Sequence, residues 1–89
     1  MSRIADRLTE LGIALPSVAK PVAAYIPAVV SGNLVYTSGQ LPMVAGELSI
    51  TRKVGAEVSA EDAKALARTC VLNGLAAADA AIGSLDRIT

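Results

Sequence analysis

Two runs of strand-forming residues on either side of Gly32-Asn33 restrict the middle of this 89-residue chain to a β-hairpin. The first run covers residues 23–30, and the second is an alternating run over residues 34–38. The second run ends abruptly at Ser38-Gly39-Gln40, and Pro42 prevents an ordinary continuation. A strand that ends in a hydroxyl group followed by a glycine exposes backbone amides beside a small polar side chain. We therefore expect the end of this strand to present a polar pocket to a small molecule.

A long helix is the second constraint, and we expect it to run from Ser59 to about Ile82. Ser59 provides a capping hydroxyl, acidic residues follow it at the positive end of the helix dipole, and Gly83 suits the helix end. One face carries only small side chains: Ala63, Ala67, Cys70, Gly74, Ala77 and Ala81. Close approach to a sheet would compensate the cost of up to ~1 kcal/mol that a glycine imposes on a helix interior. The second half is apolar nearly all round, so it needs cover on more than one side.

The N-terminal part is predicted to be a short helix and a linker. Residues 3–11 have helical periodicity, Ser2 can cap the helix and Gly12 suits its end. The prolines that follow block helix formation, so the chain is expected to be extended as far as the start of the hairpin. We therefore assign residues 1–20 to an N-terminal helix and linker.

Residues 21–89 are predicted to form a partial α+β domain. Pro27 lacks a backbone donor, so the first strand is expected at a sheet edge or a bulge. A third strand is expected at residues 48–51 or 55–58, and residues 86–89 have the pattern of an approach to another strand. Two or three strands and one long helix leave an α+β layer pair unfinished. We therefore expect the chain to be a fragment of a longer domain.

Charge and composition narrow the functional classes. The chain has 8 basic and 8 acidic residues and no basic cluster, so no nucleic-acid partner is expected. A single cysteine excludes an intrachain disulfide and suits a cytoplasmic location. No segment approaches the ~20 apolar residues of a membrane span, and the N-terminus lacks the apolar stretch of a signal peptide. The apolar fraction is 53% but the aromatic fraction only 2%, so the core should be thin and should borrow burial from partner subunits.

The residue types also limit the chemistry. The chain has no histidine, which excludes a Ser-His-Asp triad, a histidine base and a histidine zinc site. Cys70 has no neighbouring base in the sequence and is expected to be a buried structural thiol. The glycines form no phosphate-binding loop, since no Gly-Lys-Ser/Thr follows them. Chemistry would therefore depend on hydrogen bonds and bound water.

The motif from Gly32 to Pro42, together with the order hairpin, loop, long helix, resembles the RidA/YjgF/YER057c/UK114 family, also labelled endoribonuclease L-PSP. The resemblance spans roughly residues 21–88, with weaker support from Asn73 and Gly83. It implies a chorismate-mutase-like α+β fold and a homotrimer with ligand pockets between subunits. It also implies hydrolysis of reactive 2-imino acids, such as that formed from 2-aminoacrylate, to a 2-keto acid and ammonia, with no cofactor or metal.

The resemblance carries three residues over to a substrate-binding site. Tyr25 matches a tyrosine that lines the pocket, and Ser38 and Gly39 match the strand-end pair that contacts the ligand. Independently of the resemblance, a hydroxyl and an unpaired amide can hydrogen-bond an imine nitrogen or a carboxylate. Structural roles stay open as well, because Tyr25 could be a core or interface side chain and Ser38 could simply close a strand.

The chain departs from the family pattern at several positions, so alternatives to the family's deaminase activity stay open. Ala23-Ala24 replaces the family's Gly-Pro before the tyrosine, and Ile26-Pro27 replaces a polar pair after it. The family's substrate-binding arginine and late glutamate have no counterpart in these residues. We therefore expect this chain alone to have little or no deaminase activity. The alternatives are a non-catalytic protein that binds 2-keto acids, and a scaffold; neutral charge and the absence of histidine make ribonuclease activity the least favoured function.

Overall fold

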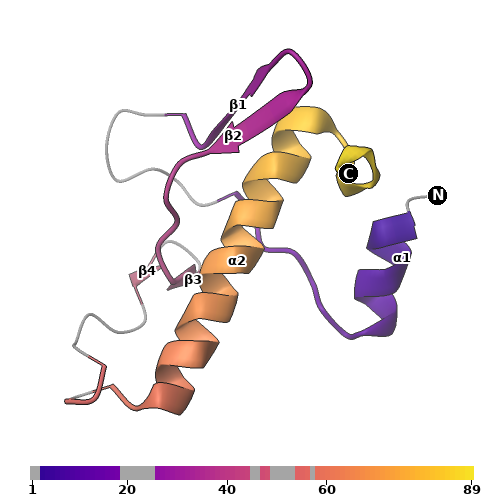
Figure 1. The fold of residues 1–89 in the computed structure, drawn as a ribbon. Coiled ribbons are helices and arrows are strands. Elements are labelled where there is room, and N and C mark those ends of the chain that lie inside the picture. The colour runs from indigo at the N-terminus through magenta and orange to yellow at the C-terminus, as the bar shows by residue number, and fades with distance from the viewer. Residues whose placement is uncertain (1–2, 19–25, 45–46, 49–53, 57) are drawn as a thin grey trace.

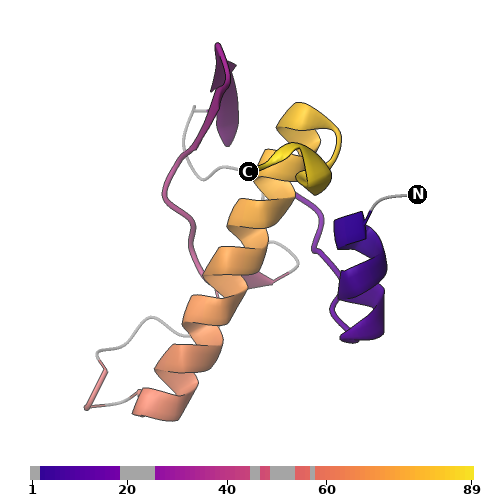
Figure 2. The same cartoon turned by 45° about the vertical axis from the view of Figure 1, so that its right-hand side comes forward.

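The computed structural model describes residues 3–18, 26–44, 47–48, 54–56 and 58–89. Its elements follow in the order α1 (Arg3–Glu10), β1 (Ala28–Ser31), β2 (Leu34–Thr37), β3 (Met43–Val44), β4 (Glu47–Leu48), α2 (Ala60–Ile82) and the 3-10 helix η1 (Leu85–Arg87). The long helix α2 contacts β1, β2, β3 and η1. The hairpin and α1 lie on opposite sides of its C-terminal end in both views (Figures 1 and 2). This arrangement is the predicted combination of a small sheet and one long helix.

The β1–β2 hairpin forms as predicted. The strands are antiparallel, with Val29 opposite Tyr36 and Val30 opposite Val35, and Gly32 in the turn has the positive φ of 60° that glycine accommodates. The paired part of the first strand is shorter than predicted, because it begins at Ala28, after Pro27. The proline thus stands where the ladder needs no amide donor. Residues 23–25 of the predicted strand lie outside the described residues.

Both predicted ends of α2 are confirmed. The Ser59 hydroxyl accepts a hydrogen bond from the Asp62 amide at 3.1 Å, which satisfies one of the unpaired amides of the first turn. Gly83 adopts the left-handed conformation, with φ of 87°, and donates its amide to Asp79 O at 2.7 Å. Because both signals are local, the helix bounds could be predicted without knowledge of the rest of the fold.

The prediction of which face of α2 is buried was partly wrong. The buried side chains of α2 are Asn73, Ala76, Ala77 and Ala78. Of the predicted small face only Ala77 is buried, whereas Ala67 and Ala81 are exposed. The side that packs is set by the loop after β2 and by β3, because Leu41 O and Met43 O there accept from the Asn73 side chain. Gly74 also needs no close approach, since a Cβ there would meet only the Gln40 Cγ at 3.7 Å, an ordinary contact.

Only part of the predicted third strand falls on described residues. There the structure has a two-residue antiparallel pair, in which Met43 faces Leu48 and Val44 faces Glu47. Leu48, the first residue of one predicted strand, is thus the last residue of β4, and residues 49–53 lie outside the described residues. In the other predicted segment, Val58 makes only an isolated bridge with Val54. No periodic pattern of side chains marks such short pairs in the sequence.

The N-terminal helix is confirmed, but its cap was not foreseen. Ser2 lies outside the described residues, and the carboxylate of Asp86 accepts hydrogen bonds from the Arg3 and Ile4 amides at 2.6 and 2.7 Å. Asp86 belongs to η1, so the approach to a strand predicted at residues 86–89 begins as a 3-10 turn. Ile88 then has extended backbone angles. A carboxylate from the opposite end of the chain therefore holds α1 in place.

The core is as thin as the composition predicted. The buried apolar residues are Val58, Ala76, Ala77, Ala78 and Leu85. The prediction that no segment could span a membrane was wrong by length and composition. With 23 residues and a mean hydropathy of 1.3, α2 is long enough and apolar enough to cross a membrane. In the structure, 22% of its most apolar stretch is buried. The helix packs on β1, β2, β3 and η1.

Candidate functional site

The predicted site residues Ser38 and Gly39 lie directly after β2, and we call this pair the strand-end corner. The Ser38 amide donates to Pro27 O at 2.9 Å, which extends the hairpin ladder by one bond. The Ser38 hydroxyl donates to the same carbonyl at 3.4 Å, and the side chain is half-buried. Since a hydroxyl also has lone pairs, the Ser38 oxygen remains available as an acceptor.

Gly39 supplies the amide of the strand-end corner. It is exposed, and its N–H has no hydrogen-bond partner in the part of the chain that the structure describes. Among the described residues, no atom would lie within 4 Å of a Cβ at this position. The corner therefore offers an acceptor on Ser38 and a donor on Gly39 that is unpaired in the described part of the chain.

The third predicted site residue cannot be placed beside this pair. Tyr25 lies outside the described residues, so its contact with a ligand stays a prediction. Its neighbour Ile26 is 70% exposed. None of the described arginines (Arg3, Arg7, Arg68 and Arg87) hydrogen-bonds to the strand-end corner.

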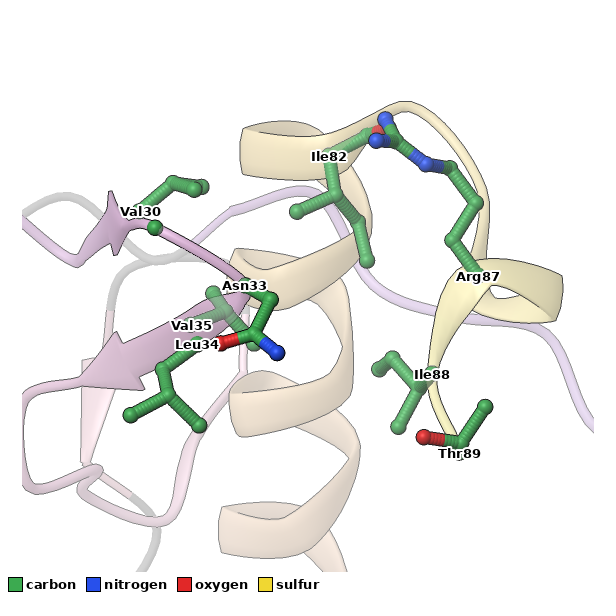
Figure 3. Close-up of a pocket in the computed structure, with 9 residues that line it drawn as sticks. Val30, Asn33, Leu34, Val35, Ile82, Arg87, Ile88 and Thr89 are labelled. Carbon is green, nitrogen blue, oxygen red and sulfur yellow. The ribbon is translucent and has the colours of Figure 1, made fainter.

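A cavity of about 290 Å³ lies at the other end of the hairpin (Figure 3). It lies between the turn, the end of α2 and residues 87–89, and both apolar and polar side chains line it. Ile82 and Ile88 point toward the turn, whereas Arg87 turns away and donates to Ile82 O at 2.7 Å. Neither Ser38 nor Gly39 lines this cavity.

Among the described residues no cluster of three or more His, Cys, Asp or Glu side chains could hold a metal ion. Cys70 is a half-buried thiol rather than the buried one that the sequence predicted. It sits where α2 is only partly covered. The chemistry open to the site is thus hydrogen bonding by the strand-end corner.

Gln40 and Asn73 were named from the sequence only as residues that carry the family resemblance; their role in holding the segment after the strand-end corner was not predicted. The Gln40 side-chain amide donates to Ser38 O at 3.2 Å. The Asn73 side-chain amide donates to Leu41 O and Met43 O, each at 3.0 Å. A polar residue within the alanine-rich half of a helix was the signal that could have identified Asn73, because such a residue is buried only when it is hydrogen-bonded.

Comparison with known proteins places the chain in a family. Residues 5–89 match the family model described as "YjgF/chorismate mutase-like, putative endoribonuclease". The chain belongs to this family. Protein TCP17 of Trypanosoma cruzi is 38% identical over 86 residues, which are 97% of this chain and 54% of that protein.

Two solved structures share the fold. A crystal structure titled as a putative endoribonuclease from Shewanella oneidensis has a TM-score of 0.86 at 34% identity, over 93% of this chain and 55% of the other. Atu1372 of Agrobacterium tumefaciens, titled as of unknown function, has a TM-score of 0.78 at 46% identity, over 93% of this chain and 50% of the other. The chorismate-mutase-like α+β fold is therefore confirmed, and the chain spans about half the length of the relatives it matches.

Proposed function

We propose that the protein containing this chain is a cofactor-independent deaminase of small 2-imino acids, acting in the cytoplasm. The strand-end corner carries the proposal, because it places the Ser38 oxygen beside the unpaired Gly39 amide at the end of β2. Family membership supports it. The imino acid or the 2-keto acid product would bind there through its carboxylate or its C=N nitrogen.

In the proposed reaction, water adds to the C=N carbon and gives a carbinolamine. The carbinolamine then collapses: its hydroxyl proton passes to the nitrogen through bound water, the C=O bond forms, the C–N bond breaks and ammonia leaves, so water is the only co-reactant and no oxidant is needed. The Gly39 amide can donate to the carbinolamine oxygen as it loses that proton, or to the substrate carboxylate, and the Ser38 oxygen can accept from the N–H of the imine. The corner thus orients the substrate while water performs the attack.

We further propose that the functional unit is a homotrimer and that the pocket is completed between subunits, without nucleic-acid or membrane partners. The outer face of the hairpin supports association, since Val29, Leu34 and Tyr36 are 48%, 55% and 54% exposed. Association would bury these apolar side chains. The chain by itself is expected to have little activity, because a carboxylate gains much from a bidentate guanidinium, and none lies at the corner among the described residues.

The test generates 2-aminoacrylate with a PLP-dependent lyase and follows the release of 2-keto acid and ammonia by the full natural polypeptide. Acceleration over the uncatalysed hydrolysis is expected, and Ser38→Ala should lower it. Ser31→Ala is the matched control, because Ser31 is an exposed serine on the other strand of the same hairpin. Absence of acceleration by the unmodified polypeptide would refute the deaminase proposal.

A second candidate is a non-catalytic protein that binds 2-keto acids. The observation in its favour is that the corner offers two groups that can donate to a carboxylate, the Gly39 amide and the Ser38 hydroxyl, whose contact with Pro27 O is long at 3.4 Å. Calorimetry with pyruvate would then show binding that Ser38→Ala weakens, while turnover of the imine stays at the background rate.

Endoribonuclease activity, named in the family description, is the third candidate. The zero net charge and the lack of histidine argue against it, since phosphate binding and general base catalysis both lose their usual groups. RNA cleavage that persists through purification and disappears in Ser38→Ala would favour it over imine hydrolysis.

A further inference from the structure

We propose that Asn73 is a positioning residue for the strand-end corner, an inference that rests on the proposed function. Asn73 is on α2, and its side chain is 1% exposed. Its amide holds the segment that follows Ser38 and Gly39 and so sets the direction in which the Gly39 N–H points.

Asn73 uses its whole donor capacity on this segment. A side-chain amide nitrogen has two N–H groups, and Asn73 Nδ2 donates to Leu41 O and to Met43 O at 3.0 Å each. Those two carbonyls flank Pro42 in a tight turn, in which the Met43 amide donates to Leu41 O at 2.7 Å. One buried side chain therefore fixes both ends of the turn to α2.

Gln40 continues the attachment toward the corner. Its side-chain amide donates to Ser38 O at 3.2 Å, and its Cγ lies 3.7 Å from where a Cβ on Gly74 would be. The side chain thus lies over α2 beside Asn73. On the other side of the corner, Pro27 O accepts from the Ser38 amide at 2.9 Å. Gly39 lies between these two fixed points, and its own amide is unpaired among the described residues.

These hydrogen bonds hold the strand-end corner in one conformation, and they do not use the Gly39 amide. Every described buried side-chain nitrogen and oxygen has a hydrogen-bond partner, so the attachment is fully satisfied. A ligand bound by one amide and one hydroxyl depends on their relative orientation, and displacement of such groups by about 1 Å can cost up to ~100-fold in rate. Removal of the Asn73 amide should therefore weaken ligand binding without removing any group that contacts the ligand.

The experiment compares Asn73→Ala with Gly74→Ala in the full natural polypeptide. Gly74→Ala changes the adjacent position of the same helix, adds only an ordinary contact with Gln40 and keeps both Asn73 hydrogen bonds. Pyruvate affinity is measured by calorimetry, and the Gly39 amide by its NMR chemical shift and hydrogen exchange. We expect Asn73→Ala to weaken pyruvate binding about ten-fold and to shift the Gly39 signal, and Gly74→Ala to change neither.

Two further variants allow the positioning role to be tested even if Asn73→Ala folds poorly. If Asn73→Ala folds poorly, it is made in the Gly74→Ala background, where a better helix former compensates, and is compared with Gly74→Ala alone. Gln40→Ala, which releases Ser38 O without touching the buried amide, should shift Gly39 in the same direction. A folded Asn73→Ala variant with unchanged pyruvate affinity and Gly39 signal would overturn the inference alone. Failure of the unmodified protein both to bind pyruvate and to hydrolyse the imine would instead overturn the proposed function, and the positioning role with it.

Discussion

The two ends of the β1–β2 hairpin offer different things to a ligand. The turn end borders a cavity of about 290 Å³ that both apolar and polar side chains line, and the Arg87 guanidinium there donates to Ile82 O. The other end of the hairpin, which we call the open end, carries the strand-end corner and lines no part of that cavity. It presents the Ser38 oxygen and a Gly39 amide that is unpaired among the described residues, on a segment that hydrogen bonds attach to α2. One end thus has a hollow, and the other has a backbone amide that is unpaired among the described residues. The comparison teaches that a hollow in the chain need not be the place where an unpaired backbone donor is available.

The largest expected effect tests how firmly the open end is held. Asn73→Leu keeps a branched side chain of similar shape but removes both N–H donors, so Leu41 O and Met43 O each lose a partner. We expect the free energy of unfolding to fall by about 1–3 kcal/mol. Urea unfolding monitored by circular dichroism measures it.

Val71→Ala is the control for Asn73→Leu, because Val71 is on the same helix and is 61% exposed. Its effect should be within about 0.5 kcal/mol, as for other surface substitutions. Equal losses for the two variants would mean that the loop carbonyls find water and that the open end is not held by Asn73.

The second effect separates the two ends by ligand binding. Ser38→Ala removes the hydroxyl at the open end, which can donate to the pyruvate carboxylate in place of its long 3.4 Å contact with Pro27 O, and should weaken pyruvate binding about ten-fold, the equivalent of one ordinary hydrogen bond. Asn33→Gly removes a polar side chain that lines the cavity while preserving the turn, and it should leave the affinity unchanged. Calorimetry on both variants decides between the ends: the opposite ranking would move the binding site to the cavity.

The parts of this molecule that could be predicted from sequence depend on local signals. Gly32 with its positive φ, the Ser59 cap and the left-handed Gly83 each act within a few residues of their position, and all three were predicted correctly. The buried face of α2 and the short β3–β4 pair depend on which segments meet in space; the buried face was predicted only in part, and the β3–β4 pair was not predicted.

The residues of the candidate site also differ in whether local signals in the sequence could locate them. Ser38 and Gly39 could be located because a strand ends at them, whereas Asn73 is 32 residues away from Leu41, which it binds. No spacing rule in the sequence connects the two. Tyr25 lies outside the described residues, so its role remains a prediction from the resemblance.

The third effect tests whether the turn end can be disturbed without affecting the open end. Asp86→Ala removes the carboxylate that accepts from the Arg3 and Ile4 amides, so α1 loses its cap. The expected loss is about 1 kcal/mol, and those amides should exchange hydrogen faster. Hydrogen exchange read by mass spectrometry or NMR measures both. The Gly39 amide should keep its exchange rate; a faster rate there would show that the two ends are coupled through α2.

The smallest effect has the opposite sign and concerns the contact between α2 and the open end. Gly74→Ala should stabilise the protein by up to ~1 kcal/mol, because alanine is the better helix former and the new Cβ would meet only the Gln40 Cγ at an ordinary 3.7 Å. Thermal unfolding measures the gain. A loss of stability would mean that another segment packs closely on Gly74 in the full protein, as the small-residue pattern of the helix first indicated. The glycine would then be a requirement of assembly, and the open end would lie at a subunit or domain contact that the described residues leave uncovered.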